Sequence, residues 1–118
     1  MNKKTDIISI DDIVKMTEVN ENNIINKLRI KKELELKRKK DYNEELYRKC
    51  LKNIDYNVSI NKFELLYNIP SRNESIKDYN FYESLIYIKK KLEKKDFIVS
   101  IILKNQSLYI SWYHLFEE

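Results

Sequence analysis

The sequence predicts an α+β protein, in which a long N-terminal helical arm precedes a small antiparallel sheet covered by helices on one face. Two runs of β-branched and aromatic residues flank a polar turn between residues 97 and 112, which is typical of a β-hairpin. Apolar residues between positions 81 and 92 are spaced four, three and four apart, as on a helix with one buried side. Residues 29–41 are highly charged and contain few apolar residues. We therefore expect two parts: residues 1–41, a mobile N-terminus and charged helical arm, and residues 42–118, a small α+β module.

The first part begins with a capping-box pattern at Ser9 and Asp12, which favours a helix start. The Asn-Glu-Asn-Asn run at residues 20–23 is expected to interrupt or restart this helix. Between residues 29 and 41 the chain consists mainly of good helix formers, so helix is predicted on propensity alone. Because this stretch has no wide apolar stripe, it is expected to stand in solvent or to lie on a partner.

The second part follows the order helix, strand, helix, strand, strand. Residues 42–54 carry an apolar stripe that should pack on the sheet. A strand is predicted around residues 62–67, where apolar and polar residues alternate, and Pro70 ends it. The next helix presents its apolar stripe from Phe81 to Leu92, and Asn80 is expected to cap it.

The hairpin fixes which side chains face the core, because alternate residues of a strand point to opposite faces. Phe97, Val99, Ile101 and Leu103 are predicted to share one face of the first strand. On the second strand, the predicted core-facing residues are Leu108, Ile110 and Trp112. The chain contains no Gly, so positions with positive φ must be filled by other residues, of which Asn and Asp are the most tolerant. We expect Asn57, Asn73 and Asn105 to serve in this way.

Basic residues are concentrated in two stretches. From Lys27 to Lys52 there are eleven Lys and Arg against five acidic residues, and from Lys89 to Lys95 five Lys against one Glu. The first 26 residues carry five acidic residues against three Lys. Two solvated helix faces would account for the basic stretches, but they could also contact nucleic acid, a membrane surface or an acidic protein. The candidate basic contact surface comprises Lys27, Arg29, Lys31, Lys32, Lys37, Arg38, Lys39, Lys40, Lys89, Lys90, Lys91, Lys94 and Lys95.

The sequence contains few of the motifs that are typical of active sites or metal sites. The absence of Gly excludes the glycine-rich phosphate-binding loops. The single Cys and single His, Cys50 and His114, cannot form a zinc site by themselves. We therefore expect no enzymatic activity, no cofactor and no metal. Cys50 is expected to be a small buried apolar residue, and a lone Cys indicates a reducing compartment. No apolar run approaches the roughly 20 residues that a membrane-spanning helix needs.

The C-terminal part resembles a family of small, largely uncharacterised proteins of nucleocytoplasmic large DNA viruses, the giant-virus group. The resemblance covers roughly residues 42–113, and its most specific part is the closing pentapeptide Leu108–Trp112. The other matching positions are Lys49, Cys50, Ile54, Phe63, Ile69, Pro70, Tyr79, Asn80, Tyr87, Ile88, Leu92, Phe97 and Val99. The chain departs from the family at Lys77, where Pro is usual, at Ser84, where Cys is usual, and at Asp96, where Gly is usual. The resemblance implies a virus-encoded protein located in the host cytoplasm or in the virion.

Two functions are consistent with these observations. The first is a non-enzymatic structural or protein-interaction protein of a large DNA virus, such as a virion component, whose helical arm docks on another viral protein. The alternative is a nucleic-acid-binding accessory factor that uses the basic helices. Residues 9–28 support the alternative, since they resemble a helix-turn-helix, with Glu18 in the turn where Gly is usual.

Overall fold

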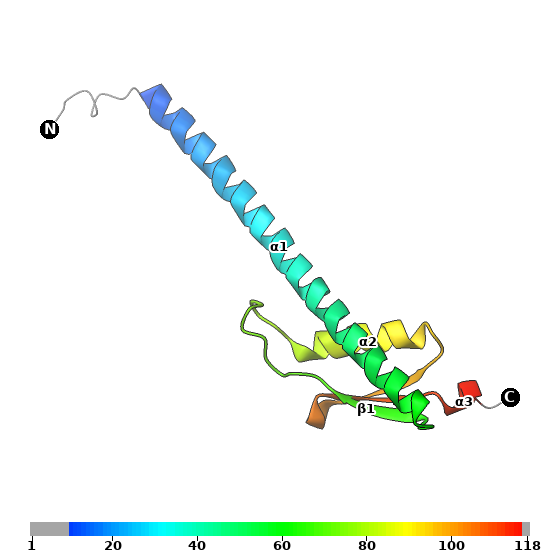
Figure 1. Cartoon of the computed structure of the whole chain (residues 1–118). Coiled ribbons are helices and arrows are strands. Elements are labelled where there is room, and N and C mark those ends of the chain that lie inside the picture. Colours follow the sequence, from blue (N-terminus) through cyan, green and yellow to red (C-terminus); the bar gives the residue numbers. More distant parts are fainter. Residues whose placement is uncertain (1–9, 117–118) are drawn as a thin grey trace. The chain divides into compact units, whose positions relative to one another are not determined.

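The computed structural model describes the backbone of residues 10–116 and the side chains of residues 20–116. The predicted mobile N-terminus and the capping box at Ser9 and Asp12 lie outside the described side chains. The chain divides into two compact units, residues 1–36 and 37–118. The elements in chain order are α1 (Ile10–Ser59), β1 (Glu64–Asn68), α2 (Phe81–Glu93), β2 (Ile98–Ile102), the 3₁₀ turn η2 (Leu103–Asn105), β3 (Ser107–Ser111) and the short α3 (Tyr113–Phe116) (Figure 1).

Helix α1 is continuous over 50 residues. The predicted interruption at residues 20–23 is therefore wrong, and so is the helix-turn-helix at residues 9–28, since the backbone described from Ile10 onward contains no turn there. The physical reason is that Asn lowers helix stability by less than about 1 kcal/mol per residue, far less than Pro does. The chain has neither Gly nor Pro before Pro70, so no strong helix breaker stands in this stretch.

In the second unit, the three strands form an antiparallel sheet in the order β1-β3-β2. Val99 lies opposite Ile110, and Ile101 opposite Leu108. On the other side of β3, Leu65 lies opposite Ile110 and Tyr67 opposite Leu108. The predicted core faces of the two hairpin strands are thereby confirmed between residues 99 and 110. A shift of the register by one residue would reverse the two faces, so this apolar alternation determines the pairing.

Leu103 was predicted to share the core face of β2, and this prediction is wrong. It lies in the 3₁₀ turn after β2, and 57% of it is exposed. The turn is completed by Gln106, whose φ is 51°. The chain has already left the strand at Leu103, so the alternation of β2 no longer determines where its side chain points.

Helices α1 and α2 place apolar side chains in one core together with the inner face of the sheet. α1 contributes Leu46, Cys50 and Ile54, and α2 contributes Leu85, Ile88 and Leu92. The hydroxyl of Tyr67 in β1 donates a hydrogen bond to the backbone oxygen of Leu46, 3.0 Å away. These contacts confirm the predicted α+β architecture, with a three-stranded antiparallel sheet and helices packed on it.

Trp112 is buried as predicted, with 6% of its surface exposed. Its indole Nε1 donates a hydrogen bond to the backbone oxygen of Lys62 at 3.2 Å. Its ring meets the ring of Phe97 edge-on, with 6.1 Å between the centroids. The polar atom of the indole is therefore satisfied while its apolar surface joins the core.

Positive φ angles occur at Asn61, Asp78, Asp96 and Gln106. The predicted residue types are right for three of these four positions, but Asn57, Asn73 and Asn105 are not among them. Asn57 remains in α1, and its side-chain nitrogen donates a hydrogen bond to the backbone oxygen of Glu64 at 2.9 Å. These Asn residues stabilise turns through side-chain hydrogen bonds or stay in helical conformations, and neither role requires a positive φ.

Candidate interaction surface

The part of α1 that belongs to the first unit presents many apolar side chains to solvent. We define the arm as residues 20–36, the stretch of the first unit whose side chains are described. The exposed fractions of its large apolar residues range from 49% for Leu34 to 60% for Ile25 and Leu28. The six residues concerned are Ile24, Ile25, Leu28, Ile30, Leu34 and Leu36.

These apolar residues lie on two sides of the helix. At 100° per residue, Ile24, Ile25, Leu28 and Leu36 fall on one side of the helix. Ile30 falls nearly opposite them, and Leu34 lies about 40° from Ile30. The arm therefore has two apolar stripes rather than one continuous buried face. A solvated surface helix would carry polar residues at most of these positions.

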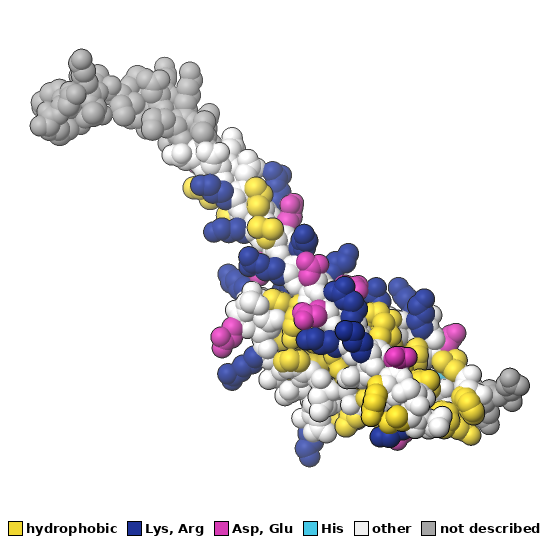
Figure 2. Space-filling model, viewed as in Figure 1, with side chains coloured by type: hydrophobic (Ala, Val, Ile, Leu, Met, Phe, Trp, Pro, Cys, Tyr) yellow, Lys and Arg dark blue, Asp and Glu magenta, His cyan; other side chains and the backbone are white. Residues whose placement is uncertain are grey.

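The basic residues predicted as a contact surface begin on the same arm. Lys27, Arg29, Lys31 and Lys32 are all exposed there. Arg29 donates a hydrogen bond to the side-chain oxygen of Asn26 at 2.7 Å. Figure 2 shows Lys and Arg side chains interspersed with apolar ones along the visible face of α1. The arm thus offers apolar and cationic groups side by side.

Further basic residues lie on the second unit. Lys37, Arg38 and Lys40 are exposed on α1, whereas Lys39 is partly buried. Lys39 lines a small hollow together with Asn80 and Ser84, at the N-terminal end of α2.

The lysines of residues 89–95 lie on the last turns of α2 and just beyond it. Lys89 pairs with Glu93, with 2.9 Å between Nζ and each carboxylate oxygen. Lys90, Lys94 and Lys95 are exposed. Since α2 is about 20 Å long, these lysines are separated by most of its length from Lys39. The basic residues of the second unit therefore form two groups rather than one patch.

Lys91 belongs to a contact between the two helices. Its Nζ lies 3.1 Å from a carboxylate oxygen of Glu44 in α1. The same ammonium lies over the rings of Tyr47 and Tyr87, 5.7 and 5.5 Å from their centroids. This lysine stabilises the packing of α2 on α1 and is less available to a ligand than its neighbours.

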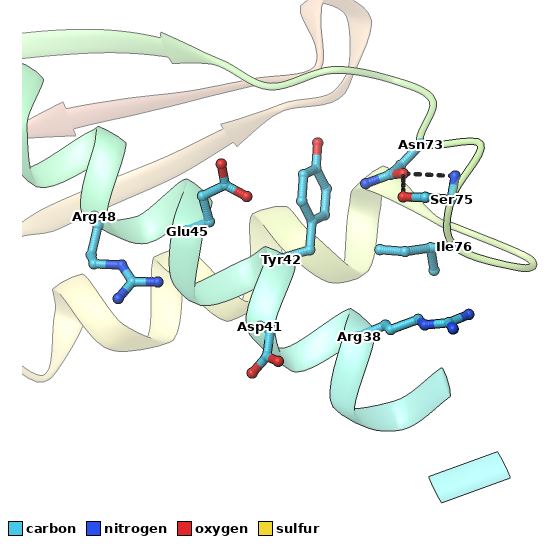
Figure 3. A pocket seen from close by; sticks show the side chains of 8 residues that line it. All are labelled: Arg38, Asp41, Tyr42, Glu45, Arg48, Asn73, Ser75 and Ile76. Carbon is cyan, nitrogen blue, oxygen red and sulfur yellow. Dashed lines mark hydrogen bonds between the residues drawn. The ribbon is translucent and has the colours of Figure 1, made fainter. Parts of the chain in front are cut away.

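An open hollow of about 810 Å³ lies between α1 and the loop before α2. Figure 3 shows Tyr42 and Ile76 at its centre, while Asp41 and Arg48 point away from the loop. Asn73 accepts hydrogen bonds from the backbone nitrogen and the hydroxyl of Ser75, at 3.0 and 2.6 Å. Charges of both signs line the hollow, so it favours neither an anion nor a cation. Its residues are Arg38, Asp41, Tyr42, Glu45, Arg48, Asn73, Ser75 and Ile76.

Cys50 and His114 lie in different environments. Cys50 is fully buried, and burial raises the pKa of its thiol to about 12. A thiol with this pKa stays protonated at neutral pH and is a poor nucleophile. His114 is exposed, and its Nε2 lies 2.6 Å from the backbone oxygen of Asp96. The structure thus places the thiol in the core and the imidazole at the surface.

A buried polar network joins α1 to α2. The hydroxyl of Tyr79 donates to that of Ser84 at 3.0 Å, and Ser84 donates to the side-chain oxygen of Asn43 at 2.6 Å. Ser84 is 1% exposed, so its hydroxyl is shielded from water. The two hydrogen bonds satisfy a hydroxyl that would otherwise be costly to bury.

A second exposed apolar surface, which the sequence reasoning did not identify, lies where α1 ends. Val58, Phe63, Trp112 and Phe116 line a hollow of about 380 Å³ there. Phe63 also meets the ring of Tyr113 edge-on, with centroids 5.0 Å apart. The apolar residues that directly follow β3 were the signal in the sequence, but a four-residue helix is too short to show a periodic pattern.

Within the described residues, no helix is long and apolar enough to cross a membrane, and no group of His, Cys, Asp and Glu could hold a metal ion. Comparison with known proteins finds no matching family model, no matching curated protein and no matching solved structure.

Proposed function

We propose that this chain is a non-enzymatic protein-interaction component encoded by a large DNA virus, and that the arm docks on another protein chain in the host cytoplasm or the virion. The α+β module would anchor the arm. The viral setting is supported by the resemblance of residues 42–113 to giant-virus proteins, and the docking role by the chemistry of the arm.

The observation that carries the docking role is the exposure of six large apolar side chains on 17 consecutive helical residues. Burying a Leu or Ile side chain fully is worth roughly 1.5–3 kcal/mol. An isolated helix of this length is marginal in water, because most helix stability in proteins comes from packing of an apolar face. A partner that covers the stripes would supply this packing.

Site-specific crosslinking tests the proposal. A photoreactive amino acid replaces Leu28 on one apolar stripe, and in a matched control it replaces Glu33, which helical geometry places far from Leu28. After irradiation in infected cells and in purified virions, we expect covalent adducts at residue 28 and far fewer at residue 33. Equal adducts at both positions, or none, would contradict docking through the arm.

A second candidate function is nucleic-acid binding, which is favoured by the exposed Lys and Arg of the arm and of α1 beyond it. Phosphate contacts would dominate, so the affinity would fall steeply with salt. A fluorescence titration with duplex and single-stranded DNA tests this function. It is rejected if no binding is detected at low salt.

A further inference from the structure

We infer that the partner of the arm is a second copy of this chain, bound as an antiparallel pair of helices. This inference rests on the proposed docking role and names the partner. It is carried by the spacing of one stripe of the arm and by the distribution of charge along α1.

Two residues of this stripe, together with one charged residue on either side of them, have the spacing of a coiled-coil seam. Glu21, Ile24, Leu28 and Lys31 follow one another at intervals of three, four and three residues. A seam with this alternation faces a neighbouring helix along its length. Ile24 and Leu28 are 56% and 60% exposed, so two apolar positions stand open between an acidic and a basic one.

Charge determines the direction of pairing. Residues 20–26 of the arm carry one acidic residue, Glu21, and no basic one, whereas residues 27–32 carry four basic residues and no acidic one. In a parallel pair the basic stretches of the two copies would lie against each other. In an antiparallel pair Glu21 of each copy lies against the basic residues of the other copy's arm, so charge complementarity selects the antiparallel arrangement.

The sequence of the arm also determines which residues of the two copies lie opposite one another. When the two helices cross at Asn26, Ile24 packs against Leu28 of the partner subunit, and by symmetry Leu28 packs against the partner's Ile24. In the same register Glu21 lies opposite the partner's Lys31. The interface then consists of apolar layers at its centre with an oppositely charged pair on either side. This self-complementary pattern is the one that a two-fold axis requires.

The register also limits the affinity. Ile25 approaches the two-fold axis from one side and adds apolar contact, while Lys27 approaches it from the other and meets its own copy. Two lysines of like charge placed next to each other oppose the pairing of the helices. Since few apolar layers offset this repulsion, the pair is a reversible dimer that depends on concentration.

Sedimentation of the purified full-length chain over a range of concentrations tests the inference. We expect the mass to rise from 14.5 kDa toward twice that value. Leu28→Asn should weaken the dimer by more than about tenfold, because two Leu side chains per dimer lose their burial. Ile30→Asn is the matched control, since Ile30 is similarly exposed but lies on the side of the helix opposite the seam, and it should leave the dimer unchanged.

A charge exchange then tests the direction of pairing. Glu21→Lys alone and Lys31→Glu alone should each weaken the dimer, because each places like charges opposite one another. The double variant should restore it. In a parallel pair Glu21 and Lys31 would each lie opposite their own copy. Neither single exchange would then add a further pair of like charges, so the double variant would have no lost affinity to restore.

The outcomes separate this inference from the proposed function. A chain that remains monomeric at every concentration overturns self-pairing, and so does a dimer that Leu28→Asn does not affect. If the chain is monomeric but residue 28 still crosslinks to a different protein, docking through the arm stands while self-pairing is rejected. If neither dimer nor crosslink is found, both are rejected.

Discussion

Lys91 and Glu44 join the two helices that cover the sheet, with 3.1 Å between the ammonium nitrogen and a carboxylate oxygen. Tyr87 donates its hydroxyl to the same carboxylate, and the ammonium lies over its ring and that of Tyr47. One lysine thus makes an ion pair and a cation–π contact with α1, and a second cation–π contact within α2.

Replacing this lysine should lower the stability of the module. Lys91→Met keeps most of the aliphatic side chain but removes the charge, and we expect a loss of about 1 kcal/mol in the free energy of unfolding. The loss is modest because both partners are partly exposed, with 42% and 32% of their side chains accessible. Urea unfolding measures it. Lys90→Met, at an exposed position of the same helix, is the control and should change stability by less than about 0.5 kcal/mol.

Trp112 should be essential for folding. Truncating a buried aromatic residue costs roughly 3–5 kcal/mol, and a domain of this size has about 5–10 kcal/mol in total. We expect Trp112→Ala to be largely unfolded by circular dichroism, and Tyr113→Ala, at a half-exposed position, to remain folded. The native protein should show a blue-shifted fluorescence emission from its single Trp. A red-shifted and readily quenched emission would contradict the burial of the indole.

Replacing Asp96 with Gly should increase the stability of the protein. The φ of 69° at Asp96 lies in the left-handed region, which costs roughly 1–2 kcal/mol for a residue with a Cβ and less for Asp. Because His114 contacts its backbone oxygen rather than its side chain, Asp96→Gly keeps that contact. We expect a gain of up to about 1 kcal/mol in thermal or urea unfolding. Lys52→Gly, in the exposed interior of α1, should instead lose about 1 kcal/mol. A loss of stability in both variants would contradict strain at Asp96.

The module should lose stability in alkaline solution. Burial raises the pKa of Cys50 from 9.0 to about 12, and burial is also the main cause that raises the pKa of Tyr67 from 10.0 to about 12. The unfolded chain releases these protons near the ordinary values, while the folded chain retains them. Their contribution to stability is therefore complete below about pH 9 and is lost as the pH rises toward 12.

Urea unfolding at about pH 8 and about pH 10.5 checks this dependence. Cys50→Val removes one of the two groups, so its stability should fall less between the two pH values than that of the wild type. An equal fall in both proteins would mean that the thiol of Cys50 titrates alike in the folded and unfolded chains.

The parts of the fold that could be predicted are those governed by a repeated local pattern. The alternation around Val99 and Ile110 determines the hairpin register, and the spacing from Phe81 to Leu92 determines the buried side of α2. The position of Leu103 was not predictable, because the direction of its side chain depends on the conformation of the turn in which it lies. The break expected at residues 20–23 does not occur because a run of Asn is only a weak signal against helix.

The candidate surface was predictable in residue type but not in arrangement. The exposure of Lys27 and its neighbours follows from the lack of a wide apolar face in that stretch. The role of Lys91 does not, because its contacts with Glu44 and Tyr47 arise only when α2 packs on α1. The sequence also contains no local sign that Lys39, in α1, lies near the N-terminal end of α2 while Lys94 lies at its C-terminal end.

The strand order β1-β3-β2 has a consequence for the synthesis of the chain. The central strand is the last of the three to leave the ribosome, so β1 and β2 emerge with no neighbour to pair with. Until β3 arrives, the apolar residues of β2 and the open edges of both strands are exposed to other nascent chains. The sheet therefore assembles in a single late step, and a stop codon just before Ser107 would leave α1, α2 and two unpaired strands that aggregate instead of folding.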